Sequence, residues 1–219
     1  MSEFESLRER MIERHIVGRG IDNPALIAAF RAVPREAFVS AGFESAAYAD
    51  APLPIGSGQT ISQPYIVALT VDSAEIGPED KVLEIGAGSG YAAAIISQVA
   101  KQVIAIERHG ELARLASERM VRLGYSNVRI VEGDGTGGLP EEAPFDAIVA
   151  SASGSHVPQV LIEQLKPDGR IVMPLGNPGA IQRLVKVTKR TDGSLDEESL
   201  GAVRFVPLIG AHAFQDGAL

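Results

Sequence analysis

Val82-Leu-Glu-Ile-Gly86-Ala-Gly88-Ser-Gly90-Tyr91 is the most informative segment of this chain, because it joins a β-branched run to a helix-like one through three alternating glycines. Glycine allows a tight turn and leaves room for a ligand beside the backbone, since it has no Cβ. A simple tight turn would need one glycine rather than three. The segment therefore predicts a ligand-binding loop at the carboxyl end of a buried strand.

Short β-branched runs alternate with helical stretches around this segment, and an apolar stripe marks a helix between the second and third runs. Strands separated by helices of this length form parallel sheets that are covered on both faces. The expected fold is α/β, a Rossmann-like, doubly wound and mostly parallel sheet. The expected strands span 81–85, 102–106, 128–131, 145–150 and 169–173.

The N-terminal region, residues 1–64, is expected to add helices and a substrate loop to this core. Asn23-Pro24 is typical of a helix start, with an N-cap before a first-turn proline. Residues 50–64 are rich in Pro and Gly, so regular structure is not expected before a helix opens near Pro64. A long irregular segment inside a compact domain is more often functional than idle.

The remainder of the chain divides into a cofactor-binding core at 65–180 and C-terminal edge strands at 181–219, all within one expected domain. In the last part, a strand at 183–189, a turn at 191–194 and a final strand at 202–208 predict a hairpin that closes one edge of the sheet. The acidic cluster 196–198 is expected in a solvated loop.

Composition excludes several classes of function. The chain has 219 residues, is 45% hydrophobic and carries a formal net charge of −8, which disfavours nucleic acid as a partner. It has no cysteine, and its four histidines lack metal-ligand spacing, so no disulfide, thiolate chemistry or metal site is expected. No apolar run is long enough to span a bilayer, and the charged N-terminus lacks a signal-peptide core. We expect a cytoplasmic protein that does not bind membranes.

The spacing of the glycines helps to distinguish which class of ligand the loop binds. The dinucleotide fingerprint is G-x-G-x-x-G, which presents a helix N-terminus to a pyrophosphate, whereas Gly86, Gly88 and Gly90 follow G-x-G-x-G. Glu84 adds a negative charge that would repel a pyrophosphate and attract a cation such as a sulfonium or ammonium group. The pattern favours S-adenosylmethionine, and a nicotinamide oxidoreductase is the disfavoured alternative.

Two further acidic positions follow the next strands. Glu107 ends the second strand, at about the distance from the glycines at which an acid binds ribose hydroxyls, although a helix-start acid is an alternative. Asp134 and Gly135 follow the third strand, where they could contact an adenine edge, although Gly-Asp-Gly alone is an ordinary turn. With Glu84, Gly86 and Gly88, these three residues are the candidate cofactor-binding set.

Several segments together resemble the protein-L-isoaspartate O-methyltransferase family over about residues 5–210. Gly-Gln-Thr-Ile-Ser-Gln-Pro is the specific one, whereas Gly-x-Gly-x-Gly indicates only the methyltransferase class. The resembling segments are Val33-Pro-Arg-Glu-Ala-Phe-Val39, Leu53–Tyr65, Val82–Tyr91, Gly133-Asp-Gly135, Ala143–Ile148 and Arg204-Phe-Val-Pro-Leu208.

The resemblance implies a class I S-adenosylmethionine-dependent methyltransferase. Its expected reaction is methyl transfer to the free α-carboxylate of L-isoaspartyl residues in damaged proteins and peptides, which initiates their repair. It assigns the active-site hydroxyl to Ser62, with Thr60, Ile61 and Gln63 beside it as substrate-binding residues. A carboxylate is already ionised at pH 7, so its attack needs no general base. A plain helix-capping role for Ser62 is the alternative.

The chain departs from the family pattern after the fourth strand. Ser151-Ala-Ser-Gly-Ser-His156 stands where members usually carry a small Thr/Gly-Ala-Ala stretch, and the C-terminal 210–214 lacks an expected Trp. Peptide preference is therefore open. Methylation of another carboxylate or a small molecule is the nearest alternative activity, and a non-catalytic cofactor-binding protein is a third. A monomer is expected.

Overall fold

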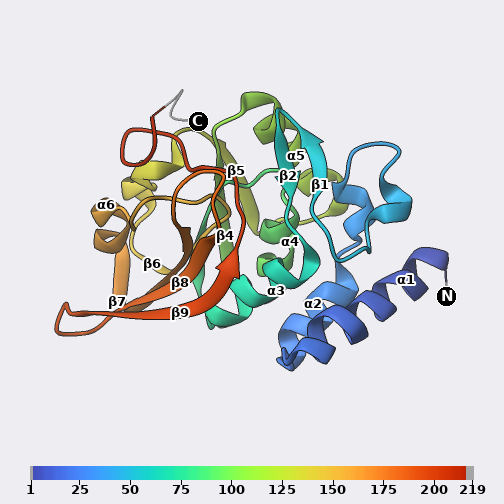
Figure 1. Ribbon diagram of the computed structural model, residues 1–219, viewed down its shortest axis with the longest axis horizontal. Helices are drawn as coiled ribbons and strands as arrows, with labels where there is room; N and C mark the ends of the chain where they lie inside the picture. The colour runs from blue at the N-terminus through green and yellow to red at the C-terminus, as the bar shows by residue number, and fades with distance from the viewer. Residues whose placement is uncertain (1, 216–219) are drawn as a thin grey trace.

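The centre of the computed structural model, which describes residues 2–215, is a seven-stranded sheet in the order β5-β4-β3-β6-β7-β8-β9 (Figure 1). The first five strands in this order run parallel, and β8 and β9 join them antiparallel. This confirms the predicted fold class. The strands are β3 (Lys81–Ile85), β4 (Gln102–Glu107), β5 (Val128–Glu132), β6 (Phe145–Ala150), β7 (Leu165–Leu175), β8 (Gln182–Lys189) and β9 (Leu195–Val203).

Both faces of the sheet are buried around β3 and β6, where successive strand residues point to opposite sides and each side packs in its own apolar cluster. Along β3, Val82 belongs to one apolar cluster and Leu83 to the other, and Val149 and Ile148 of β6 divide in the same way. The larger cluster packs under α2 (Pro24–Ala32), α3 (Pro64–Ser73) and α4 (Tyr91–Ser97), and the smaller under α6 (Gln159–Glu163). α5 (Gly110–Leu123) packs against β4 and β5.

The N-terminal region is helical, as its sequence predicts. α1 (Glu3–Met11) continues into a π-helical turn (Ile12–Ile16) and a 3₁₀ turn (Val17–Arg19) before α2, and further 3₁₀ turns span Arg35–Phe38 and Glu44–Ala46. The Asn23 side chain accepts hydrogen bonds from the Ala25 and Leu26 N–H groups, which confirms the predicted N-cap. These elements lie together on one side of the molecule (Figure 1).

The expectation of an irregular segment up to Pro64 is wrong in part. Residues 53–61 form a small antiparallel hairpin of β1 (Leu53–Gly56) and β2 (Gln59–Ile61), and α3 then opens at Pro64 as expected. Leu53, Ile55 and Ile61 are buried, so alternating apolar residues hold the hairpin against the core. Its proline and two glycines concealed that alternation.

The C-terminal hairpin is confirmed, but its second strand lies earlier than predicted. β9 spans Leu195–Val203, so the acidic residues 196–198 lie in an exposed edge strand and not in a loop. Residues 204–208 continue outside any strand and cross back over the sheet, where Ser153 and Pro207 form an isolated bridge. Further 3₁₀ turns span Gly135–Gly137 and Pro140–Glu142. Among residues 2–215, no helix is long and apolar enough to cross a bilayer.

Candidate active site

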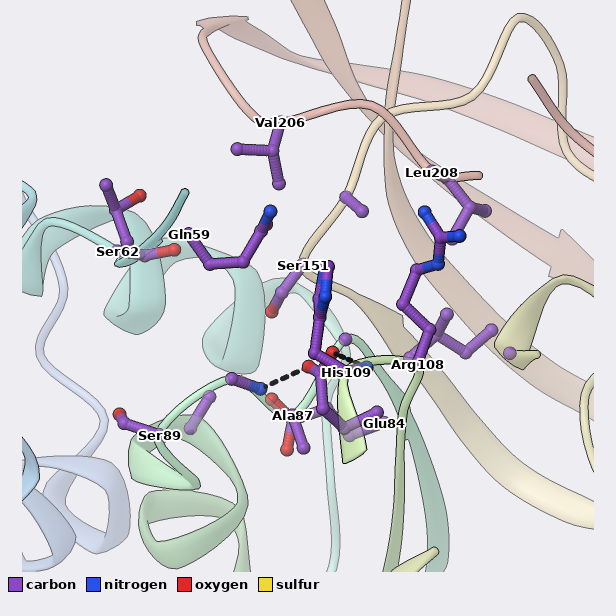
Figure 2. A pocket seen from close by; sticks show the side chains of 18 of the residues that line it. Gln59, Ser62, Glu84, Ala87, Ser89, Arg108, His109, Ser151, Val206 and Leu208 are labelled. Atoms are coloured by element: carbon purple, nitrogen blue, oxygen red, sulfur yellow. Dashed lines mark hydrogen bonds between the residues drawn. The ribbon is translucent and has the colours of Figure 1, made fainter. Parts of the chain in front are cut away.

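A cavity of about 420 Å³ lies at the carboxyl ends of β3, β4 and β6, within the volume range of small-molecule sites. Figure 2 shows how several segments surround it: Gln59 comes from the hairpin, Ser62 directly follows it, Glu84 comes from β3, and Val206 and Leu208 come from the C-terminal segment. Parallel strands end at one edge, so loops distant in sequence converge there. The position agrees with the ligand site predicted from the glycines.

The glycine loop curves around one wall of this cavity. Gly88 and Gly90 have φ angles of +54° and +85°, which side-chain-bearing residues rarely adopt. A Cβ on Gly90 would stand 2.7 Å from Met120 Cε, and one on Gly88 would stand 3.1 Å from Ile55 Cδ1. Glycine is therefore required both for the turn and for the close packing of neighbouring elements. The loop presents its backbone to the cavity with Gly86 at its start.

Glu107 holds the glycine loop in place. Its Oε2 accepts a hydrogen bond of 2.8 Å from the Gly88 N–H, and its Oε1 accepts one of 2.9 Å from the His109 N–H. Figure 2 marks these bonds at the floor of the cavity. The side chain is buried but still lines the cavity, and a carboxylate has lone pairs left for two ligand hydroxyls. The predicted ribose acid thus also organises the loop.

Glu84 is the most unusual group in the cavity. Its side chain is only 1% exposed, and both carboxylate oxygens lack a hydrogen-bond partner among the described residues. Burial, reinforced by the negative charge of Glu107, raises the pKa of Glu84 well above its usual value, and the nearby Ala93 N–H opposes this only in part. A buried, unpaired carboxyl aimed into a cavity fits a cationic ligand group that would complete it.

The other two candidate cofactor residues are placed differently. Gly135 lines the cavity, whereas Asp134 is not among the lining residues. The Asp134 carboxylate accepts hydrogen bonds from the Thr136 N–H and hydroxyl, and from the Ala211 N–H at 2.8 Å. Asp134 therefore ties the C-terminal segment to the rim beside Gly135.

The candidate substrate residues lie at the opposite wall. Thr60, Ile61 and Ser62 line the cavity, but Gln63 lines a neighbouring groove and donates a hydrogen bond of 2.7 Å to Asp50. The capping alternative for Ser62 is wrong, because Gln63 is the N-cap of α3 and the free N–H of Tyr65 in its first turn donates to the Asp50 carboxylate instead. Neither Ser62 nor its neighbours in 58–63 carry positive charge.

A second groove of about 610 Å³ adjoins the cavity. It runs between the hairpin and the C-terminal strand, past Ile181 and Phe205. Ser62, Ser151 and Thr60 line both hollows, so they mark the junction between them. Sequence reasoning noted Ser151 only as a departure from a pattern.

Sequence reasoning missed the C-terminal wall of the cavity altogether. Residues 206–209 form part of its lining, and the expectation of a continuous strand through 208 concealed their role. Among residues 2–215, no group of three or more His, Asp or Glu side chains is placed to hold a metal ion.

Comparison with known proteins identifies the family. Residues 6–213 match the family model described as Protein-L-isoaspartate(D-aspartate) O-methyltransferase. The chain belongs to this family. The resemblance inferred from the sequence is thereby confirmed.

Two relatives of similar length are about 50% identical to this chain in sequence. A protein-L-isoaspartate O-methyltransferase 2 of Pelobacter propionicus is 51% identical over 96% of this chain and 93% of its own length. A protein-L-isoaspartate O-methyltransferase of Brucella anthropi is 48% identical over 99% of both chains.

Two solved structures share the fold. One protein-L-isoaspartate O-methyltransferase superposes with a TM-score of 0.85 at 29% identity, covering 94% of this chain and 67% of its own. A Plasmodium falciparum protein described as a protein-L-isoaspartate O-methyltransferase, in complex with S-adenosyl-L-homocysteine, has a TM-score of 0.78 at 26% identity. That match covers 95% of this chain and 99% of the other.

Proposed function

We propose that this protein transfers a methyl group from S-adenosylmethionine to the free α-carboxylate of L-isoaspartyl residues in damaged proteins and peptides, which initiates their repair. The observation that carries the proposal is the junction at Ser62. There, a glycine-walled cavity with a buried acid meets a groove open enough for a peptide. Two separate substrates can therefore approach each other at an uncharged hydroxyl.

On the donor side, Glu84 would attract the positive charge of S-adenosylmethionine, since its carboxylate oxygens have no partner within the described structure. The backbone at Gly86 and Gly88 would lie against the ligand without a Cβ to obstruct it. Glu107 would accept hydrogen bonds from the ribose hydroxyls. When bound, S-adenosylmethionine supplies a methyl group that its positive sulfur makes susceptible to nucleophilic attack.

The loop that follows β5 completes the donor side, together with the C-terminal segment that bonds to it. We assign the adenine end to the rim at Asp134 and Gly135, where Gly135 lines the cavity. The Asp134 carboxylate already accepts three protein hydrogen bonds, so it would act by shaping this rim.

On the acceptor side, Ser62 and Thr60 would donate hydrogen bonds to the substrate carboxylate, and Ile61 would shape the wall. Gln63 would act by fixing the loop through its bond to Asp50. The carboxylate is ionised without help, so no base has to take a proton from it. The chain's task is to align two bound partners and to exclude water, and orientation alone can contribute about 7–11 kcal/mol.

The proposal also covers the partners, the oligomeric state and the localisation of the protein. The proposed partners are isoaspartyl proteins and peptides rather than nucleic acids, because a net charge of −8 disfavours polyanions. We further propose a monomer that acts in the cytoplasm. Neither feature is needed for the chemistry at the junction.

The test uses two peptides that differ only in one residue, which is L-isoaspartyl in one and L-aspartyl in the other. With radiolabelled S-adenosylmethionine, only the isoaspartyl peptide should gain a base-labile methyl ester. Equal labelling of both peptides, or labelling of neither, would refute the proposed substrate. S-adenosylhomocysteine binding without labelling of either peptide would instead favour methylation of another carboxylate or a small molecule.

A further inference from the structure

Arg35 is a buried cation that the proposed reaction does not use, and it reaches the substrate loop. We propose that Arg35 is a positioning residue that holds Ser62 at the junction of the two cavities. Arg119 has the corresponding role for the glycine loop. This inference rests on the proposed function, since it assigns to Arg35 an effect on the acceptor side of that reaction.

The contacts of Arg35 join three distant segments. Its Nη2 donates a hydrogen bond of 2.8 Å to the Ser62 carbonyl, and its Nε donates one of 2.7 Å to the Ala47 carbonyl. Its guanidinium carbon stands 4.7 Å from the centre of the Tyr91 ring, and Tyr91 lines the donor cavity. Arg35 thus ties the 44–47 turn, the substrate loop and the start of α4 to one rigid group.

Burial of the Arg35 guanidinium costs free energy, because the charged group is removed from water. The residue is 0% exposed, and its Nη1 has no hydrogen-bond partner within the described structure. Burial lowers the pKa of its guanidinium, although the neighbouring Tyr91 opposes this. Within residues 2–215 no carboxylate lies at ion-pair distance from it, so the ring face and the two carbonyls, with the more distant charge of Asp50, stabilise its charge. The planar guanidinium holds Nε and Nη2 in a fixed geometry that matches the two carbonyls, and the ammonium of a lysine does not reproduce that geometry.

Arg119 makes the matching connection to the other ligand loop. From α5, its Nη1 donates a hydrogen bond of 2.7 Å to the Ser89 carbonyl inside the glycine loop. Its Nε donates another of 2.7 Å to the Ala37 carbonyl, in the same 3₁₀ turn that carries Arg35. The Arg35–Phe38 turn is therefore connected by one arginine to the acceptor loop and by another to the donor loop.

The test compares three arginine-to-lysine variants. Arg35→Lys keeps the positive charge but removes the rigid Nε and Nη2 pair that donates to the Ala47 and Ser62 carbonyls. Arg119→Lys makes the same change at the donor loop. Arg31→Lys is the matched control, because Arg31 is half exposed on α2 and pairs with Glu9 away from both loops. Each purified protein is assayed for S-adenosylhomocysteine affinity, kcat and KM with the isoaspartyl peptide, and amide hydrogen exchange.

The expected results differ between the two sites. Arg35→Lys should lower kcat/KM for the peptide at least tenfold, with S-adenosylhomocysteine affinity within threefold of wild type and faster exchange in residues 53–63. Arg119→Lys should weaken S-adenosylhomocysteine binding at least fivefold, with faster exchange in residues 86–97. Arg31→Lys should match the wild type in every measurement.

The inference is overturned if Arg35→Lys behaves like Arg31→Lys, or if it weakens donor binding and peptide turnover by the same factor. The second result would indicate a general loss of structure rather than positioning of Ser62. The exchange measurement does not depend on turnover. If the wild type fails to methylate the isoaspartyl peptide, the proposed function fails, while exchange in 53–63 still decides whether Arg35 holds the loop.

Discussion

Replacing Glu107 with glutamine should weaken both the fold and the donor site. In the wild type, one carboxylate oxygen accepts from the Gly88 N–H and the other from the His109 N–H. A glutamine amide has only one acceptor oxygen, so its NH₂ group must face one of these N–H groups. One hydrogen bond is lost, and two donors are brought into opposition beside the glycine loop.

The size of the effect follows from the kind of bond that is lost. A hydrogen bond to a charged group contributes about 1.5–3 kcal/mol, so we expect a loss of about 2 kcal/mol in the free energy of unfolding. For a chain of this size, 1 kcal/mol corresponds to roughly 2–4 °C in Tm, which gives a decrease of about 4–8 °C. The Gly88 backbone lines the proposed donor cavity, so S-adenosylhomocysteine affinity should fall by more than about tenfold.

Urea unfolding, differential scanning calorimetry and isothermal titration with S-adenosylhomocysteine would measure these changes. Glu118→Gln is the control, since Glu118 is exposed and makes only an i,i+4 pair with Arg114, worth about 0.3–0.5 kcal/mol. If Glu107→Gln is as stable as this control and binds the ligand as the wild type does, Glu107 does not organise the loop. The reasoning about its two hydrogen bonds would then be refuted.

Three further outcomes are expected. Ser62→Ala should lower turnover of the isoaspartyl peptide by at least about tenfold while S-adenosylhomocysteine affinity changes little; equal loss of both would indicate a collapsed loop. Burial raises the pKa of Glu84, whereas a bound cation would favour its ionised form, so ligand binding should be coupled to release of a proton and affinity should increase as pH rises towards the raised pKa. Titrations in buffers of different ionisation enthalpy should detect this proton in the wild type and not in Glu84→Gln. Asn23→Ala should lower the free energy of unfolding by about 1 kcal/mol in urea, with unchanged kinetics, because α2 loses its cap.

The raised pKa of Glu84 also predicts how pH affects the unliganded fold. The folded-state pKa lies above the unfolded value, so the stabilising contribution is complete at acidic pH and is lost as pH rises through the folded pKa. Glu84→Gln should remove this dependence. The difference in unfolding free energy between the two proteins therefore tests the assignment without any ligand.

The central sheet was predictable because its signals are local. The parallel strands β3, β4, β5 and β6 have five or six residues each and lie where the β-branched runs predict, whereas β7 begins at Leu165, four residues before the predicted strand. The hairpin at 53–61 was missed because prolines and glycines outweighed its alternation of buried residues. The last strand was misplaced because its exposed acidic residues carry no apolar pattern, and pairing with β8 selects it instead.

The residues of the site also fall into two groups: those that the local sequence predicted and those that only tertiary packing brings together. Local sequence alone identified the glycine loop, Glu84 and Glu107 as candidates, because each lies at or directly after the carboxyl end of a strand. The roles of Arg35 and Ser151, and the wall at 206–209, depend on contacts between segments far apart in the chain. Arg35 reaches Ser62 across 27 residues, and no local pattern encodes such a distance. Chain composition and periodicity specify which elements form, whereas packing of those elements specifies which side chains meet, and in this protein the acceptor side of the site arises from that packing.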